Sequence, residues 1–120
     1  MSKKTVVIGA SDNPDRYSYL AVQKLRANEH EVIAIGKSKA VVADVTIETE
    51  PVLANDVDTV TLYVNPILQK NYYDYILSLK PKRIIFNPGT ENEELSELAF
   101  KNNIQPFMAC TLVMLGTKQY

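Results

Sequence analysis

Residues 9–18 carry the side chains best suited to binding a ligand. Gly9 ends an apolar run at residues 5–8, and a polar loop then leads into a segment with a helical pattern. A buried strand that turns through glycine into a helix can hold a phosphate, because free main-chain N–H groups meet the positive end of the helix dipole there. We expect a pyrophosphate cradle in this loop. Its predicted contacts are Gly9, Ala10, Ser11, Asn13, Arg16 and Ser18.

Two simpler interpretations compete with this cradle. A glycine after the first strand is also common where a helix packs tightly on a sheet. Arg16 lies near Asp12 and Asp15 in the sequence, so it could form only a solvated ion pair, which contributes little to stability.

The residues after the second predicted strand indicate which nucleotide the loop would bind. Gly9 is followed by Ala10 and Ser11, so the G-x-G-x-x-G dinucleotide pattern is incomplete. Sheets that bind NAD usually carry an acid after the second strand, whereas this chain has Gly36-Lys37. A lysine there suits an additional ribose phosphate, which favours coenzyme A or NADP over NAD.

Two further loops reach the same edge of the predicted sheet. Asn65-Pro66 follows the third clear strand and matches a helix N-cap with proline in the first turn. Asn87-Pro88-Gly89 follows the next strand, and Thr90 and Glu93 have capping-box spacing. Turn and capping chemistry accounts for both loops. As ligand contacts we predict Val64, Asn65, Pro66, Asn87 and Gly89, in addition to Gly36 and Lys37.

The sequence offers little for catalysis or metal binding. It has one histidine, His30, and one cysteine, Cys110, too few for the usual zinc sites. We expect His30 at the amino edge of the sheet and on the surface, with no catalytic role. Cys110 is interpreted as a small core residue, with a thiol near the ligand as the alternative. We therefore predict no catalytic residues and no metal site.

The bulk composition narrows the class of protein. The 120 residues carry a net charge of −1, and we treat residues 1–120 as one domain. This charge lacks the basic surface that nucleic-acid binding usually needs. There is no apolar run of membrane-spanning length and no segment resembling a signal peptide, and the single cysteine fits a reducing compartment. We expect a cytoplasmic protein that binds a small nucleotide, with a homodimer left open.

The order of the elements predicts the fold. Strands are expected at residues 5–8, 31–35, 59–64, 83–86 and 104–108, with a short edge strand possible at 45–47. Helices are expected at 17–28, 66–79, 90–103 and 110–115. This alternation predicts an α/β fold with a doubly wound, mostly parallel Rossmann-like sheet of about five strands and helices on both faces.

Residues 7–18, Val-Ile-Gly-Ala-Ser-Asp-Asn-Pro-Asp-Arg-Tyr-Ser, resemble the opening signature of the small stand-alone CoA-binding domain proteins. These are similar to the CoA-binding domain of the succinyl-CoA synthetase alpha subunit. The resemblance covers nearly the whole chain, and Gly36-Lys37 is similar to the Pro-Gly-Lys turn of that domain. It implies that Lys37 approaches a CoA phosphate and that the chain binds CoA or an acyl-CoA without catalytic machinery. An NADP-binding oxidoreductase or redox sensor, and a self-associating scaffold without ligand, are the alternatives.

Overall fold

The computed structural model describes residues 2–120 and contains one seven-stranded sheet in the order β3-β4-β2-β1-β5-β6-β7. The strands are β1 (Thr5–Ala10), β2 (Val32–Gly36), β3 (Ala40–Val42), β4 (Val45–Glu48), β5 (Thr59–Leu62), β6 (Arg83–Phe86) and β7 (Gln105–Met108). All pair in parallel except β3, which pairs antiparallel with β4 at the edge of the sheet.

The connection order reverses at β1, which lies between β2 and β5. The chain winds outward from β1 to β2 and β4, then returns to β5 and continues outward to β6 and β7. In an open α/β sheet, the crevice at such a reversal is where ligands bind, beyond the carboxyl ends of the strands. The fold therefore places the loops after β1 and β5 side by side.

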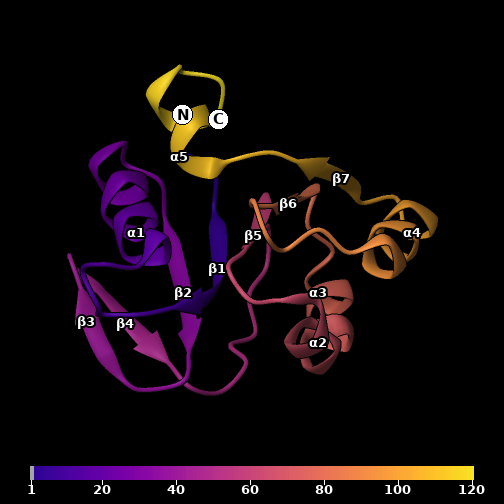
Figure 1. Ribbon diagram of the computed structural model, residues 1–120, viewed down its shortest axis with the longest axis horizontal. Helices are drawn as coiled ribbons and strands as arrows, with labels where there is room; N and C mark the ends of the chain where they lie inside the picture. Colours follow the sequence, from indigo (N-terminus) through magenta and orange to yellow (C-terminus); the bar gives the residue numbers. More distant parts are fainter. Residues whose placement is uncertain (1) are drawn as a thin grey trace.

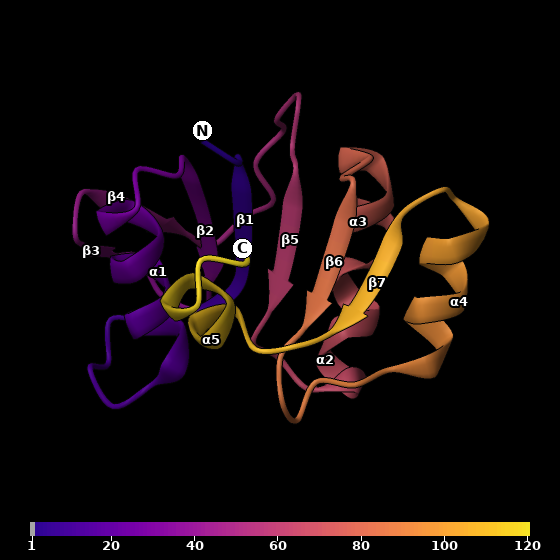
Figure 2. The same ribbon diagram turned by 90° about the horizontal axis from the view of Figure 1, so that it is seen from above.

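Helices cover both faces of the sheet (Figure 1, Figure 2). One face carries α1 (Tyr17–Ala27) and α5 (Thr111–Gly116), and its core joins Val22 and Leu25 to Leu115. The other face carries α2 (Pro66–Gln69), the 3-10 turn η1 (Lys70–Tyr72), α3 (Tyr73–Leu79) and α4 (Glu93–Lys101). The predicted α/β, doubly wound, Rossmann-like architecture is confirmed.

The number of strands differs from the prediction of about five. The segment after Lys37 forms a hairpin, in which β3 and β4 meet through a turn at Ala43, whose φ is 54°. Alternating burial explains why the hairpin holds to the sheet: Val45 and Ile47 are buried, whereas Thr46 is exposed.

Helix boundaries also differ in places. The expected helix over residues 66–79 is divided into α2, η1 and α3, although its apolar stripe still buries Tyr75, Ile76 and Leu79. The predicted cap at Thr90 is wrong, because α4 begins at Glu93 and Asn92 caps it by accepting from the Leu95 N–H at 3.2 Å.

Candidate functional site

The loop between β1 and α1 is shaped by its own short side chains. The Asn13 N–H donates to Ser11 Oγ, and the Asp15 N–H donates to Asn13 Oδ1, each at 3.0 Å. The Arg16 N–H donates to the Asn13 carbonyl at 3.0 Å. These bonds form consecutive turns, as expected for Asx and Ser chemistry. Ser11 and Asn13 thus define the shape of the loop with the side-chain oxygens that the sequence offered as ligand contacts.

Helix α1 begins immediately after this loop with an N-cap, Arg16, that makes no side-chain capping bond. The first N–H groups of a helix have no partner within the helix, so those of Tyr17 and Ser18 are available to an anion. Arg16 is exposed, and within residues 2–120 it forms no ion pair with Asp12 or Asp15. Ser18 is 4 % exposed, so its side chain lies against the core.

Two glycines bring the loops of neighbouring strands together. A Cβ built at Gly9, whose φ is +93°, would lie 2.8 Å from Val64 Cγ1 and 2.9 Å from the Tyr63 carbonyl oxygen. A Cβ at Gly36 would lie 2.3 Å from the Ala10 carbonyl oxygen. Only glycine permits these approaches, so both residues have a packing role. That role closes the crevice between β1 and its two neighbours.

The two lysines after β2 differ in their surroundings. Lys39 pairs with Glu48 at 3.6 Å, whereas Lys37 is exposed and has no carboxylate within ion-pair distance among residues 2–120. Lys37 is therefore the cation of this loop that is available to a ligand.

The loop after β5 is held by a buried amide that the sequence analysis missed. Asn65 Oδ1 caps α2 by accepting from the Leu68 N–H at 2.9 Å, and Pro66 occupies the first turn, as predicted. Gln69 is fully buried and donates through Nε2 to the carbonyls of Val64 at 2.9 Å and Thr90 at 2.7 Å. Gln69 thereby ties the loop after β5 to the loop after β6. A glutamine four residues after an N-cap carries no distinctive sequence signal.

Asn87 is a second buried hub, at the end of β6. It is 2 % exposed, and its Nδ2 donates to Thr61 Oγ1 at 2.6 Å and to the Leu62 carbonyl at 2.8 Å. Its Oδ1 accepts from the Thr111 N–H at 2.9 Å. With its amide engaged on both sides, Asn87 joins β5, β6 and the start of α5. Gly89, in contrast, has φ +91° and faces open space.

Tyr63 and Cys110 lie where β5 ends and α5 begins. The Tyr63 Oη is buried without a hydrogen-bond partner among the described residues, and burial raises the pKa of this phenol well above its ordinary value. Cys110 is partly buried at the N-cap of α5. The thiol is thus on the ligand edge of the sheet, on a partly accessible surface.

His30 lies at the opposite, amino edge, as expected, but the prediction of a surface position is wrong. It is 8 % exposed because the Tyr120 ring packs on it with centroids 4.9 Å apart. Its Nδ1 accepts from the Lys3 N–H at 2.9 Å. Burial, followed by the charges of Lys3 and Arg83, lowers the pKa of His30. Its neighbour Tyr120 is 90 residues away in the chain, so local sequence could not reveal the contact.

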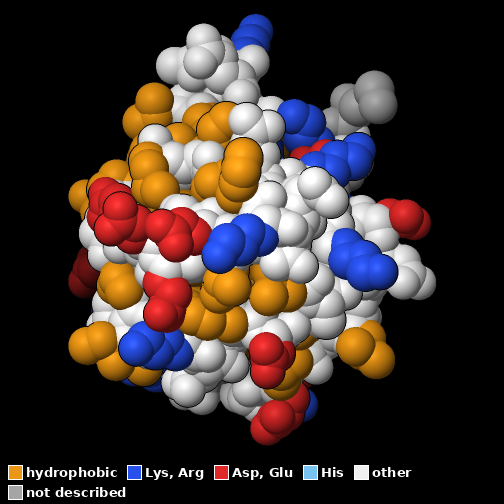
Figure 3. All heavy atoms as spheres, turned by 90° about the vertical axis from the view of Figure 1, so that its right-hand side faces the viewer, with side chains coloured by type: hydrophobic (Ala, Val, Ile, Leu, Met, Phe, Trp, Pro, Cys, Tyr) orange, Lys and Arg blue, Asp and Glu red, His pale blue; other side chains and the backbone are white. Residues whose placement is uncertain are grey.

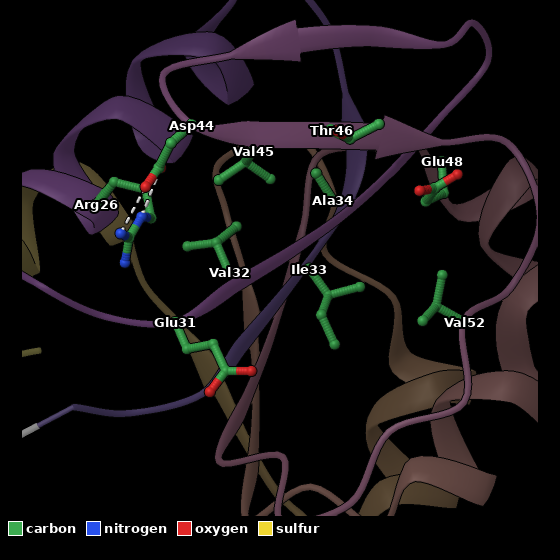
Figure 4. Close-up of a pocket in the computed structure, with 10 residues that line it drawn as sticks. All are labelled: Arg26, Glu31, Val32, Ile33, Ala34, Asp44, Val45, Thr46, Glu48 and Val52. Atoms are coloured by element: carbon green, nitrogen blue, oxygen red, sulfur yellow. Dashed lines mark hydrogen bonds and ion pairs between the residues drawn. The ribbon is translucent and has the colours of Figure 1, made fainter.

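Two cavities lie away from the ligand edge. A cavity of about 390 Å³ opens between β2 and β4, with Val32, Ile33 and Val45 along it and the Arg26–Asp44 ion pair at one end (Figure 4). A more open one of about 740 Å³ lies between residues 54–57 and the end of α3. Neither is lined by a predicted ligand residue. Among residues 2–120, no cluster of three or more metal-ligating side chains is present, and no helix is long and apolar enough to cross a membrane.

Comparison with known proteins identifies the family. The model of a family described as CoA binding domain matches residues 3–116. The chain belongs to this CoA-binding domain family. No curated protein matched the chain at a significant level.

Solved structures share the fold over the whole CoA-binding domain. One crystal structure, of an uncharacterized protein, is 51 % identical, covers 100 % of this chain and 99 % of its own, and superposes with a TM-score of 0.96. A hypothetical protein from Pyrococcus horikoshii is 21 % identical, with 97 % and 83 % covered and a TM-score of 0.83. A conserved hypothetical protein from Pyrococcus furiosus is 24 % identical, with 92 % and 97 % covered and a TM-score of 0.80.

The residues at the carboxyl edge fit the nucleotide part of CoA. CoA presents a pyrophosphate and a separate ribose phosphate, which need anion-binding groups at two places. The first turn of α1 with Arg16 supplies one place, and Lys37, after the neighbouring strand, supplies the other. When bound, CoA supplies a thiol, or a thioester when acylated.

Proposed function

We propose that this protein binds coenzyme A, or an acyl-CoA, at the carboxyl edge of its sheet and does not itself catalyse a reaction. The observation that carries this proposal is the arrangement of unpaired cationic groups around the β1–α1 loop. Arg16 and Lys37 have no ion-pair partner among residues 2–120, and they follow two adjacent strands.

In this proposal, the backbone of the loop binds the pyrophosphate. The N–H groups of Ser11 and of the first turn of α1 donate to it, Arg16 contributes charge, and Ser11 and Asn13 keep the loop in shape. The helix dipole of α1 adds a favourable field for the anion.

The adenosine and the pantetheine would lie to either side of β1. Gly36 and Lys37 would face the ribose phosphate, and the loop of Val64, Asn65 and Pro66 would contribute its backbone. Asn87 would act through the position of its loop, because its amide is already bonded within the protein. Gly89 has open space beside it and would tolerate close approach of a ligand.

A binding role is supported by where the titratable groups lie. The single histidine is buried at the amino edge, with its Nδ1 engaged by the Lys3 N–H. A general base must reach the proton that it removes, and His30 lies across the sheet from the proposed ligand. The Tyr63 phenol, with its raised pKa, remains a neutral donor at physiological pH.

Calorimetric titration tests the proposal directly. We expect CoA to bind to the wild-type protein and NADP to bind at least tenfold more weakly. The Arg16→Ala variant should lose at least tenfold in CoA affinity, because a charge-assisted contact contributes about 1.5–3 kcal/mol. Lys24→Ala, which removes an exposed lysine in the last turn of α1, is the matched control and should leave the affinity unchanged.

Two results would overturn this assignment. Absence of heat and of any thermal shift at millimolar CoA would exclude the ligand. Preference for NADP over CoA in competition would instead indicate the nicotinamide nucleotide.

A further inference from the structure

Half of one sheet face has no helix over it. Seen from the side that carries α1 and α5, those helices lie over β1 and β2, whereas β6 and β7 are in open view (Figure 2). Phe107 of β7 is on this face, because the Arg83 guanidinium lies 6.0 Å from its ring centroid. Phe107 is 37 % exposed. The β6–β7 half of this face therefore presents apolar surface to solvent.

Helix α5 has an uncovered side as well. Thr111 and Leu115 are buried and hold the helix to the core, but Val113 is 60 % exposed, and Leu112 and Met114 are partly exposed. Helix α5 packs beside α1 and does not cover β6 or β7 (Figure 1, Figure 2). Its apolar outer side has no cover among residues 2–120.

Both uncovered surfaces come from one uncharged stretch. Residues 105–117 contain no Asp, Glu, Lys, Arg or His, although the chain carries 13 basic and 14 acidic residues elsewhere. In the view onto β7 and α4, hydrophobic side chains gather in the upper part, toward α5, and acidic ones lie below them (Figure 3). A strongly charged partner would find no counter-charge within this stretch.

Pairing of an extended peptide with the β7 edge is also disfavoured. The N–H groups of Gln105 and Ala109 donate to the carbonyls of Lys82 and Phe86, so the N–H groups of these alternate residues point toward β6. The residue that points to the free edge between them is Pro106, which has no N–H to donate. Proline at such a position protects an edge strand from pairing.

We propose that a second copy of this chain covers the surface, with α5 of each copy packed on the β6–β7 face of the other. A two-fold axis brings the same patch of both subunits together, so one rotation covers the open helix and the open sheet face twice. An uncharged apolar patch meets its own copy without like-charge repulsion. This assembly is independent of the ligand site and goes beyond the proposed function.

Sedimentation equilibrium on the full chain tests this assembly. We expect a concentration-dependent mass that approaches twice the monomer mass. Val113→Glu should raise the dimer dissociation constant at least about tenfold, because a buried carboxylate would face the partner's apolar sheet. Leu53→Glu is the matched control: Leu53 is 90 % exposed and lies between β4 and β5, so this variant should keep the wild-type mass.

A second variant guards against a simple loss of folding. Gln105→Lys changes an exposed strand residue next to the proposed seat of the partner's α5, and by itself it should weaken the dimer. Combined with Val113→Glu, it should recover part of the association, since the two new charges face each other across the interface. Thermal unfolding of each variant should match the wild type.

A wild-type protein that stays monomeric at about 0.5 mM would overturn the assembly, because interfaces of standard size associate well below that concentration. So would a Val113→Glu variant that is folded and dimeric with unchanged affinity. Dimers disrupted by Leu53→Glu but not by Val113→Glu would place the interface elsewhere.

Discussion

Gly9 and Tyr63 approach so closely that a Cβ at position 9 would lie 2.9 Å from both the carbonyl carbon and the carbonyl oxygen of Tyr63. This contact joins the loops after β1 and β5 at the strand where the winding direction reverses. The first prediction concerns this contact. Gly9→Ala should lower the free energy of unfolding by about 2–4 kcal/mol, through backbone strain at positive φ and overpacking.

Urea unfolding measures that loss. The matched control is Gly116→Ala, at the end of α5, where a Cβ would meet open space and φ is not positive. That variant should be as stable as the wild type or slightly more stable. Equal stability of Gly9→Ala and the wild type would contradict the packing role of Gly9.

Lys37 should recognise the ribose phosphate of CoA and no other part of it. Lys37→Ala is expected to weaken CoA binding about tenfold, while 3′-dephospho-CoA should bind equally to the variant and the wild type. Calorimetry with both nucleotides provides the comparison. Lys39→Ala is the control, because that side chain pairs with Glu48. An equal loss for both nucleotides would assign Lys37 to another group.

Gln69 should tolerate no negative charge. Gln69→Glu would put a buried carboxylate against the carbonyl oxygens of Val64 and Thr90 and remove two donated hydrogen bonds. We expect a loss of about 3 kcal/mol or more at pH 7 in chemical unfolding. Burial would raise the pKa of the new carboxyl group, so the loss should shrink as the pH falls toward 5.

Gln23→Glu gives the reference for that measurement. Gln23 is exposed on α1, so the same change there should alter stability by no more than about 0.5 kcal/mol at either pH. A Gln69→Glu loss that does not depend on pH would show that the new carboxyl group is not buried.

His30 should make stability fall in mild acid. Its pKa in the folded protein is lowered, first by burial and then by Lys3 and Arg83, with Asp58 acting in the opposite direction. The unfolded chain therefore binds the proton more readily. The stabilisation is complete above a pH of about 6.5, the ordinary histidine pKa, and is lost as the pH falls below it.

His30→Gln should flatten this dependence, because a glutamine oxygen can still accept from the Lys3 N–H but does not titrate. Thermal unfolding between pH 7.5 and pH 5 compares the slopes. If the variant keeps the wild-type slope, another group is responsible for the acid sensitivity.

Much of the fold could be predicted because it depends on local pattern. β-Branched runs, the Asn65-Pro66 cap and the alternation of strands and helices indicated a parallel α/β sheet with its loops at one edge. The lysine after the second strand and the residues 7–18 indicated the CoA-binding family, which the match over residues 3–116 confirms. These features follow from chemistry within a few residues, or from one loop.

The tertiary structure decided which polar side chains support the fold and which remain available to a ligand. Asn87 and Gln69 became buried hubs, and His30 became buried under Tyr120, through partners 19 or more residues away. Lys37 and Lys39 look alike in the sequence, but only Lys39 meets a carboxylate, because the unforeseen β3–β4 hairpin brings Glu48 to it. Such pairings depend on strand order and on close approaches at Gly9 and Gly36, and local sequence does not encode them.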